Sequence, residues 1–78
     1  MKAQLTPQEE QVYAELIRLA GPAKKVSSLQ LRDAGFAQFV ASVYGANVGY
    51  PDAHQSRKLQ LIRNKKWITM DRGTYSIL

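Results

Sequence analysis

Side chains that can form paired hydrogen bonds with a flat polar edge recur at helical spacing in the second half of the chain. Arg57 can donate two hydrogen bonds to a guanine edge, and Gln60 can both donate to and accept from an adenine edge. Two small residues, Ala53 and Ser56, allow a close approach, and His54 could reach a base edge or a phosphate. We therefore predict contacts with base edges in the DNA major groove for Ala53, His54, Ser56, Arg57 and Gln60.

A helix must present these residues, and we predict it from Asp52, its N-cap, to about Lys65. At about 100° per residue, Gln55, Leu59 and Ile62 point to one side and face the core, and the candidate base contacts point roughly the other way. A helix of about 14 residues is about 21 Å long, and only its N-terminal half can reach bases in a groove. The alternative is that the polar side is an ordinary solvated helix face.

Basic and polar residues around this helix are predicted to contact the sugar-phosphate backbone. Lysines at the C-terminal end of the helix can reach phosphates, and so can Arg72, which stands beside Gly73 in a predicted turn. Such contacts give affinity and register but carry no sequence information. The alternative is solvation for each lysine and core packing for Tyr50. The predicted backbone contacts are Asn47, Tyr50, Lys58, Arg63, Lys65, Lys66, Arg72 and Thr74.

The first helix is marked at both of its ends. Thr6 can cap it, Pro7 suits its first turn, and Glu9 completes a capping box. Apolar residues recur at helical spacing behind this start, and Gly21-Pro22 ends the helix. A short basic connector over residues 23–27 then leads to a second helix.

The second helix is predicted to begin at Ser28, its cap. Gly35 lies inside this stretch, so we expect the helix to bend or break there. A loop rich in Gly, Asn and Pro follows over residues 44–51. The residues expected on one face of the second helix are Leu29, Arg32, Phe36, Val40 and Val43.

The end of the chain has β-forming residues in place of a helical pattern. They alternate around Trp67 and again around Tyr75, and residues 71–73 supply a turn that contains glycine, so we predict a hairpin. The order helix, helix, loop, helix, hairpin predicts a mainly α fold with a small β-hairpin, a winged helix-turn-helix, as a single domain over residues 1–78. Trp67 is expected to pack at the core or hinge, with stacking or methyl binding as the alternative.

The composition restricts the classes of function. The 78 residues include no cysteine and one histidine, so disulfides and cysteine-based zinc sites are excluded and we expect no metal site. Eleven lysines and arginines against six acidic residues give a net charge of +5, which favours an anionic partner such as nucleic acid. No membrane span or signal peptide is recognisable, so we expect a cytoplasmic protein with no membrane partner. Glycine-rich phosphate loops, nucleophile elbows and paired carboxylates are missing, so we expect neither catalysis nor a cofactor.

Three stretches of the sequence resemble a known family: Gln55 to Asn64, then Lys65-Lys66-Trp67-Ile68-Thr69, then Arg72-Gly73-Thr74-Tyr75. They are similar to the C-terminal winged-helix domain of methyladenine-dependent restriction endonucleases. In that family a helix containing Leu-Gln-x-Leu-Arg-Asp runs into Gly, a hydrophobic strand and a Gly-x-Tyr strand. The sequence departs from the pattern at two positions, because Lys66 stands where the family often has Gly and Asn64 replaces Asp.

The resemblance implies a module that reads N6-methyladenine in a short palindromic site such as GATC. It would be the specificity domain of a modification-dependent restriction endonuclease, and such domains are usually fused to a nuclease domain. A methyl group adds apolar surface in the major groove, which Ala53, the stem of Arg57, Val48 and Tyr50 could contact. The implied partner is double-stranded DNA, with its adenine methylated if the family's preference holds.

Two other functions remain open for a domain of this kind. A winged-helix transcription regulator would use the same fold but would normally dimerise to read two half-sites. No dimerisation helix is visible after Leu78, so we expect a monomer. A protein-interaction domain could use the same surface, and then replacing Arg57 or Arg72 by alanine would leave DNA affinity unchanged.

Overall fold

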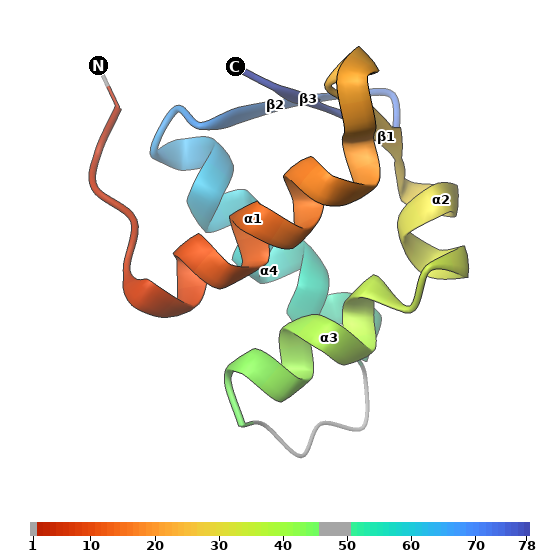
Figure 1. Ribbon diagram of the computed structural model, residues 1–78. Coiled ribbons are helices and arrows are strands. Elements are labelled where there is room, and N and C mark those ends of the chain that lie inside the picture. Colours follow the sequence, from red (N-terminus) through yellow and green to blue (C-terminus); the bar gives the residue numbers. More distant parts are fainter. Residues whose placement is uncertain (1, 46–50) are drawn as a thin grey trace.

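The computed structural model describes residues 2–45 and 51–78, without the side chains of residues 51–54. Helices dominate this part of the chain, and three short strands form one antiparallel sheet (Figure 1). The predicted mainly α fold with a β-hairpin is therefore confirmed. The helices are α1 (Pro7–Ala20), the 3-10 helix η1 (Gly21–Ala23), α2 (Ser28–Asp33), α3 (Phe36–Val43) and α4 (Pro51–Asn64), and the strands are β1 (Lys25–Ser27), β2 (Ile68–Asp71) and β3 (Thr74–Ile77).

Helix α1 begins and ends as its sequence predicts. The Thr6 hydroxyl accepts a hydrogen bond from the Glu9 N–H at 3.2 Å, and the Glu9 carboxylate accepts one from the Thr6 N–H at 2.8 Å. This capping box satisfies two backbone donors that a helix start leaves without partners. Gly21 ends the helix with a φ of 66°, a conformation that glycine adopts without steric cost.

Gly35, with a φ of 71°, breaks the predicted second helix into α2 and α3. Helix α2 is capped by Ser27, one residue earlier than predicted. The break changes the helical phase, so the prediction of one continuous face is wrong at its first two positions. Leu31 is buried in place of Leu29, which is 54% exposed, and Arg32 is also exposed.

Strand β1 corrects the prediction of a connector over residues 23–27. It pairs with β3, placing Val26 opposite Tyr75, and β3 pairs on its other edge with β2, placing Met70 opposite Tyr75. The sheet order is β1-β3-β2, and all pairs are antiparallel. Three residues are too few to show strand alternation, and their partner lies at the other end of the chain, so the local sequence does not reveal this strand.

The turn between β2 and β3 consists of Arg72 and Gly73. Their φ angles are 52° and 78°, and two-residue hairpin turns of type I′ require positive φ at both positions. Glycine tolerates this conformation, whereas arginine is strained in it. The backbone N–H of Ser28 donates to the Gly73 carbonyl at 2.7 Å, so the turn is fixed against the start of α2.

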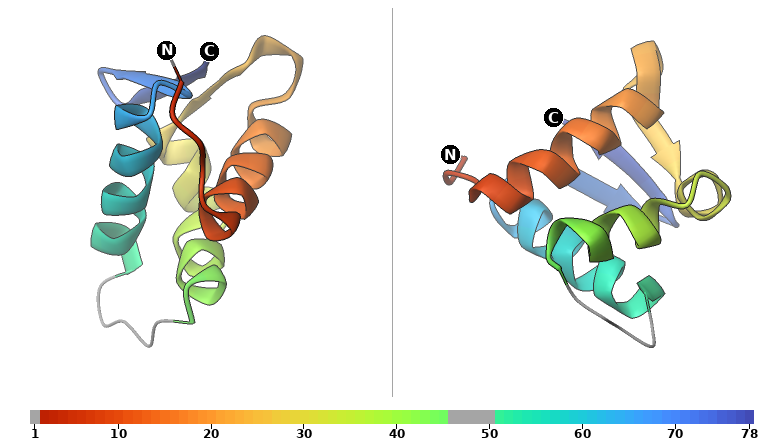
Figure 2. Two further views of the ribbon diagram at one scale, coloured as in Figure 1. Left: turned by 90° about the vertical axis from the view of Figure 1, so that its left-hand side faces the viewer. Right: turned by 60° about the horizontal axis from the view of Figure 1, so that its bottom comes forward.

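The core lies between the helices and the sheet. Figure 2 (left) shows α4 running beside α1 and α3, with the sheet lying across one end of the helices. Ile62 of α4 and Ile68 of β2 are both buried, so they join the helical layer to the sheet. The other side chains with almost no exposure include Phe36, Leu16, Leu31 and Leu59.

A partly buried ion pair fixes the C-terminal end of α4 to the start of α1. The Lys65 Nζ lies 2.5 Å from the carboxylate of Glu9, whose side chain is 5% exposed. Burial raises the pKa of Glu9, but hydrogen bonds from Lys65 and Thr6 and the charge of Lys65 outweigh it and hold that pKa below its ordinary 4.5. The ionised carboxylate is therefore part of the folded structure at neutral pH.

Trp67 packs against the N-terminal segment and α1. Its indole N–H donates to the Ala3 carbonyl at 2.6 Å, and its ring meets that of Tyr13 edge-on with centroids 5.3 Å apart. The Lys2 ammonium lies over the indole ring, 4.5 Å from its centroid. The predicted packing role of Trp67 is confirmed, and this side chain fixes the connection between α4 and the hairpin.

Candidate nucleic-acid interface

Helix α4 divides into a buried and an exposed side as predicted. Leu59 and Ile62 are 1% and 0% exposed and face the core. On the other side Ser56, Arg57 and Gln60 are exposed. The prediction about the orientation of α4 is therefore confirmed for the side chains that the structure describes.

Ala53 and His54, the two remaining candidate base contacts, lie near the start of α4. Their side chains fall outside the described residues. The candidate backbone contacts Asn47 and Tyr50 also lie outside the described part of the chain. The exposed side of α4 is therefore defined below by its residues from Ser56 onward.

The margins of α4 differ in character. On one margin the Lys58 ammonium lies over the Tyr44 ring, 4.2 Å from its centroid. Beyond it Leu61 is 43% exposed, and Asn64 is exposed on the side opposite the core. Lys58 is thus held beside α3, although a long lysine side chain can still extend from such a contact.

A hollow of about 230 Å³ separates the other margin of α4 from the sheet. Burial raises the pKa of the Tyr75 hydroxyl above its ordinary 10, and the nearby positive charge of Arg63 opposes that rise. Arg63 therefore lies close to the sheet on the same side of α4 as Ser56. The residues around this hollow are Ser56, Leu59, Gln60, Arg63, Met70 and Tyr75.

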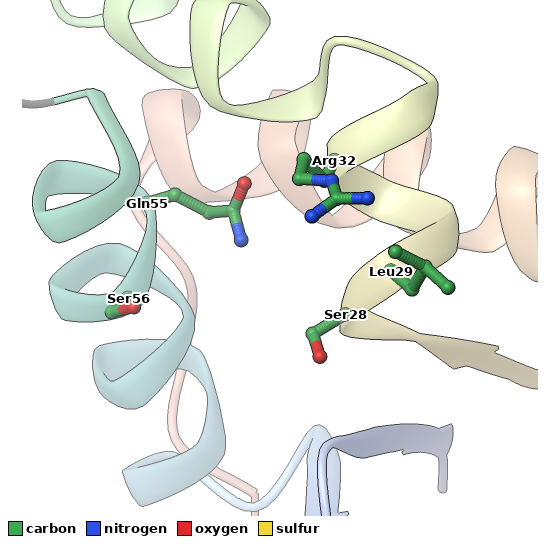
Figure 3. Close-up of a pocket in the computed structure, with 5 residues that line it drawn as sticks. All are labelled: Ser28, Leu29, Arg32, Gln55 and Ser56. Atoms are coloured by element: carbon green, nitrogen blue, oxygen red, sulfur yellow. The ribbon is translucent and has the colours of Figure 1, made fainter.

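A second pocket, of about 320 Å³, lies between α2 and α4 (Figure 3). Gln55 extends from α4 towards α2, and Arg32 lies opposite it on α2. Ser28, Leu29 and Ser56 complete the lining. The sequence pattern did not identify this pocket, because it assigned Gln55 and Arg32 to buried helix faces and placed no two helices side by side.

The hairpin turn lies at the edge of this second pocket. An ideal Cβ built on Gly73 would stand 3.3 Å from the Ser28 hydroxyl, so the turn and the first residue of α2 are in close contact. Arg72 precedes that glycine and is exposed. Arg72 therefore extends from the hairpin near the end of α2 that borders the pocket.

The other predicted phosphate contacts are distributed unevenly. Lys65 is engaged by Glu9, as described above, and we leave it out of the candidate interface. Lys66 is exposed and has a φ of 72°, a left-handed conformation that glycine adopts without steric cost. Thr74 is half-buried in β3, where it stands opposite Ser27 and Asp71.

Positive charge predominates around the exposed side of α4. Arg57 and Arg63 are exposed on the helix itself, and Arg32 and Arg72 stand on the flanking elements. Asp33 lies 3.6 Å from Arg32, but both side chains are more than two-thirds exposed, so this pair is weak and easily exchanged. Exposed arginines around a bare helix are suited to an anionic partner.

Two other kinds of site are not formed in the part of the chain that the structure describes. No group of three His, Cys, Asp or Glu residues there could hold a metal ion. No helix there is long and apolar enough to cross a membrane.

In comparisons with known proteins, no family model, no curated protein and no solved structure matches the chain.

Proposed function

We propose that the chain binds double-stranded DNA as a single winged-helix domain, with α4 in the major groove. The observation that carries this proposal is the exposed side of α4 formed by Ser56, Arg57 and Gln60. Arginine and glutamine are the side chains that pair with the guanine and adenine edges in that groove. Ser56 beside them is small and leaves room for the helix to approach the base pairs.

The order of elements supports the winged-helix assignment. α4 is followed directly by the β2–β3 hairpin, and the short α2 precedes it on its other flank. In such folds one helix enters the groove and the flanking elements meet the phosphates beside it. The two-residue turn keeps the wing short, so Arg72 would meet the backbone close to the helix.

The charges around α4 support the same partner. A net charge of +5 and the exposed Arg32, Arg63, Lys66 and Arg72 would neutralise phosphates on both sides of the groove. Each neutralised phosphate adds about 0.9 to the slope of log affinity against log salt. A DNA complex that uses three or four of these residues would therefore show a strong salt dependence.

The finer form of the proposal is a reader of N6-methyladenine in a GATC-like site. It is supported by the resemblance of residues 55–75 to the methyladenine-dependent restriction endonucleases. Burying one methyl group contributes about 0.8 kcal/mol, so methylation alone would raise affinity about 4-fold. In this proposal the domain is a cytoplasmic, monomeric specificity module without chemistry of its own, and cleavage would belong to an attached nuclease domain.

A titration of labelled duplexes tests both levels of the proposal. Fluorescence anisotropy would compare methylated and unmethylated GATC duplexes at about 50 and 200 mM salt, a range over which phosphate contacts change affinity strongly. We expect affinity to fall with salt and to be higher for the methylated duplex. Equal affinities would eliminate the methyladenine reader and keep the DNA-binding domain.

Replacing Arg57 by alanine tests whether α4 is the contact surface. Loss of a bidentate contact to guanine costs about 1–3 kcal/mol, so we expect affinity to fall about 5- to 150-fold. Arg18→Ala is the matched control, since it removes the same charge from an exposed site on α1. Equal affinity of both variants and the wild type would point to the protein-interaction class instead.

A further inference from the structure

The pocket between α2 and α4 contains a buried polar atom without a partner. Gln55 is 8% exposed, and its Oε1 accepts no hydrogen bond from the residues that the structure describes. Buried polar atoms are almost always hydrogen-bonded in folded proteins, because a buried acceptor without a donor destabilises the fold. Within the described residues this oxygen makes no stabilising hydrogen bond, so it is free to accept one from a ligand.

The side chain is placed to meet such a ligand. Figure 3 shows the Gln55 carboxamide extending from α4 into the space in front of α2, with Arg32 on the opposite wall. The terminal torsion of glutamine is broad, so the amide can rotate and turn its oxygen towards a donor on a bound group. Ser28 on the α2 wall and Ser56 on the α4 wall bring two hydroxyl groups to the rim of the pocket.

The chemistry of the unpartnered atom limits what the ligand can be. A carboxamide oxygen needs a hydrogen-bond donor, and a phosphate diester has none. Among the groups that DNA presents in the major groove, only the amino groups of adenine (N6) and cytosine (N4) are donors. Arg32 has donors alone and can serve a phosphate or a base acceptor beside that amino group.

We propose that Gln55 is a specificity-determining residue whose carboxamide oxygen accepts a hydrogen bond from the exocyclic amino group of an adenine or a cytosine in the major groove. This inference rests on the proposed DNA binding. It adds a base contact from the side of α4 that faces α2, at a residue that the helical pattern assigns to the core. Arg32 completes the site by holding the neighbouring phosphate.

Methylation of that amino group would block the contact with Gln55. In a base pair one amino hydrogen is used by the partner base, and only the other faces the major groove. A methyl group on the amino nitrogen of a paired base takes that place and removes the donor. Gln55 therefore reads an unmodified base, and any methylated adenine in the site lies at another position.

Selection from a randomised duplex library tests the role of Gln55. The wild type, Gln55→Met and Gln55→Leu would each be selected against the same library, with thermal melts to show that each variant folds. Methionine keeps the length and unbranched shape of glutamine, and both replacements remove the buried atom without a partner. We expect both variants to melt no lower than the wild type.

The sequence preferences give the decisive comparison. We expect the wild type to prefer adenine or cytosine at one position, and both variants to lose that preference, about 5- to 150-fold, while they keep the others. Unchanged preferences in folded variants would overturn the role of Gln55 and leave DNA binding intact. Failure of the wild type to bind any duplex would overturn both proposals.

Modified bases then distinguish the two sources of the amino group. At the position that depends on Gln55, a wild-type preference for adenine should disappear when N6-methyladenine is substituted, and a preference for cytosine when N4-methylcytosine is substituted. Gln55→Met should bind the modified and unmodified duplexes equally. A wild-type protein that tolerates both methylated bases at that position would contradict the inference.

Discussion

Replacing Arg72 by asparagine should stabilise the fold and weaken DNA binding at the same time. Arg72 occupies the first position of the hairpin turn with a φ of 52°. A left-handed residue with a side chain costs about 1–2 kcal/mol, and asparagine recovers part of that cost because it tolerates this conformation and favours the I′ turn before glycine. The exchange also removes one positive charge from the proposed phosphate contacts.

If asparagine recovers about half of the strain, the gain is about 0.5–1 kcal/mol, which corresponds to an increase in Tm of about 2–8 °C for a domain of this size. Loss of one phosphate contact reduces the salt slope by about 0.9, so the ratio of wild-type to variant affinity should shrink about 3.5-fold between about 50 and 200 mM salt. Circular dichroism melts and anisotropy titrations at several salt concentrations measure the two quantities.

Lys24 offers a matched control for this variant. It is exposed, has a φ of 59°, and ends η1 beyond α1. Lys24→Asn therefore makes the same change in charge and relieves a similar backbone conformation away from α4. It should raise Tm without changing the salt slope, and an Arg72→Asn variant that is more stable with an unchanged slope would refute the phosphate contact at the hairpin.

Two further predictions concern the supports of α4. Glu9→Gln removes the charge that Lys65 pairs with and should lower the free energy of unfolding at neutral pH by about 1.5–3 kcal/mol, the contribution of a hydrogen bond to a charged group. Because the pKa of Glu9 is lowered in the folded state, its stabilisation is complete above pH 4.5 and is lost as pH falls through the folded-state pKa. The difference in free energy of unfolding between the wild type and the variant, measured by urea unfolding, should therefore disappear on acidification. A difference that persists at about pH 2 would contradict the ion pair as its source. Lys66→Gly relieves the left-handed residue after α4 and should raise the free energy of unfolding by about 1 kcal/mol, whereas a loss of stability would show that the Lys66 side chain makes a compensating contact.

The features that the sequence predicted well are local ones. The start of α1 depends on Thr6 and Glu9, three residues apart, and the orientation of α4 follows from the spacing of Leu59 and Ile62. In both cases the hydrogen bonds or the periodicity lie within one or two helical turns. Such signals do not depend on how the rest of the chain folds.

The features that the sequence did not reveal depend on distant partners. Strand β1 exists because Val26 pairs with Tyr75 at the other end of the chain. The exposure of Arg32 follows from the break at Gly35. The sequence predicts a bend or break there, but it does not show how the break changes the helical phase of the preceding turn. The pocket of Gln55 was not predicted either, because it forms only when α2 stands beside α4 as a separate helix.

The positions of the proposed base contacts around α4 determine how the helix can lie in the groove. At about 100° per residue, Gln55 and Arg57 lie about 200° apart, and Ser56 lies between them. The floor of one groove therefore cannot face both, and an α4 that turns Ser56 towards the base pairs has Gln55 and Arg57 at opposite margins. The base positions that lose their preference in Gln55→Met and in Arg57→Ala should then differ. If both variants lost preference at the same base pair, α4 could not lie in the groove with Ser56 innermost.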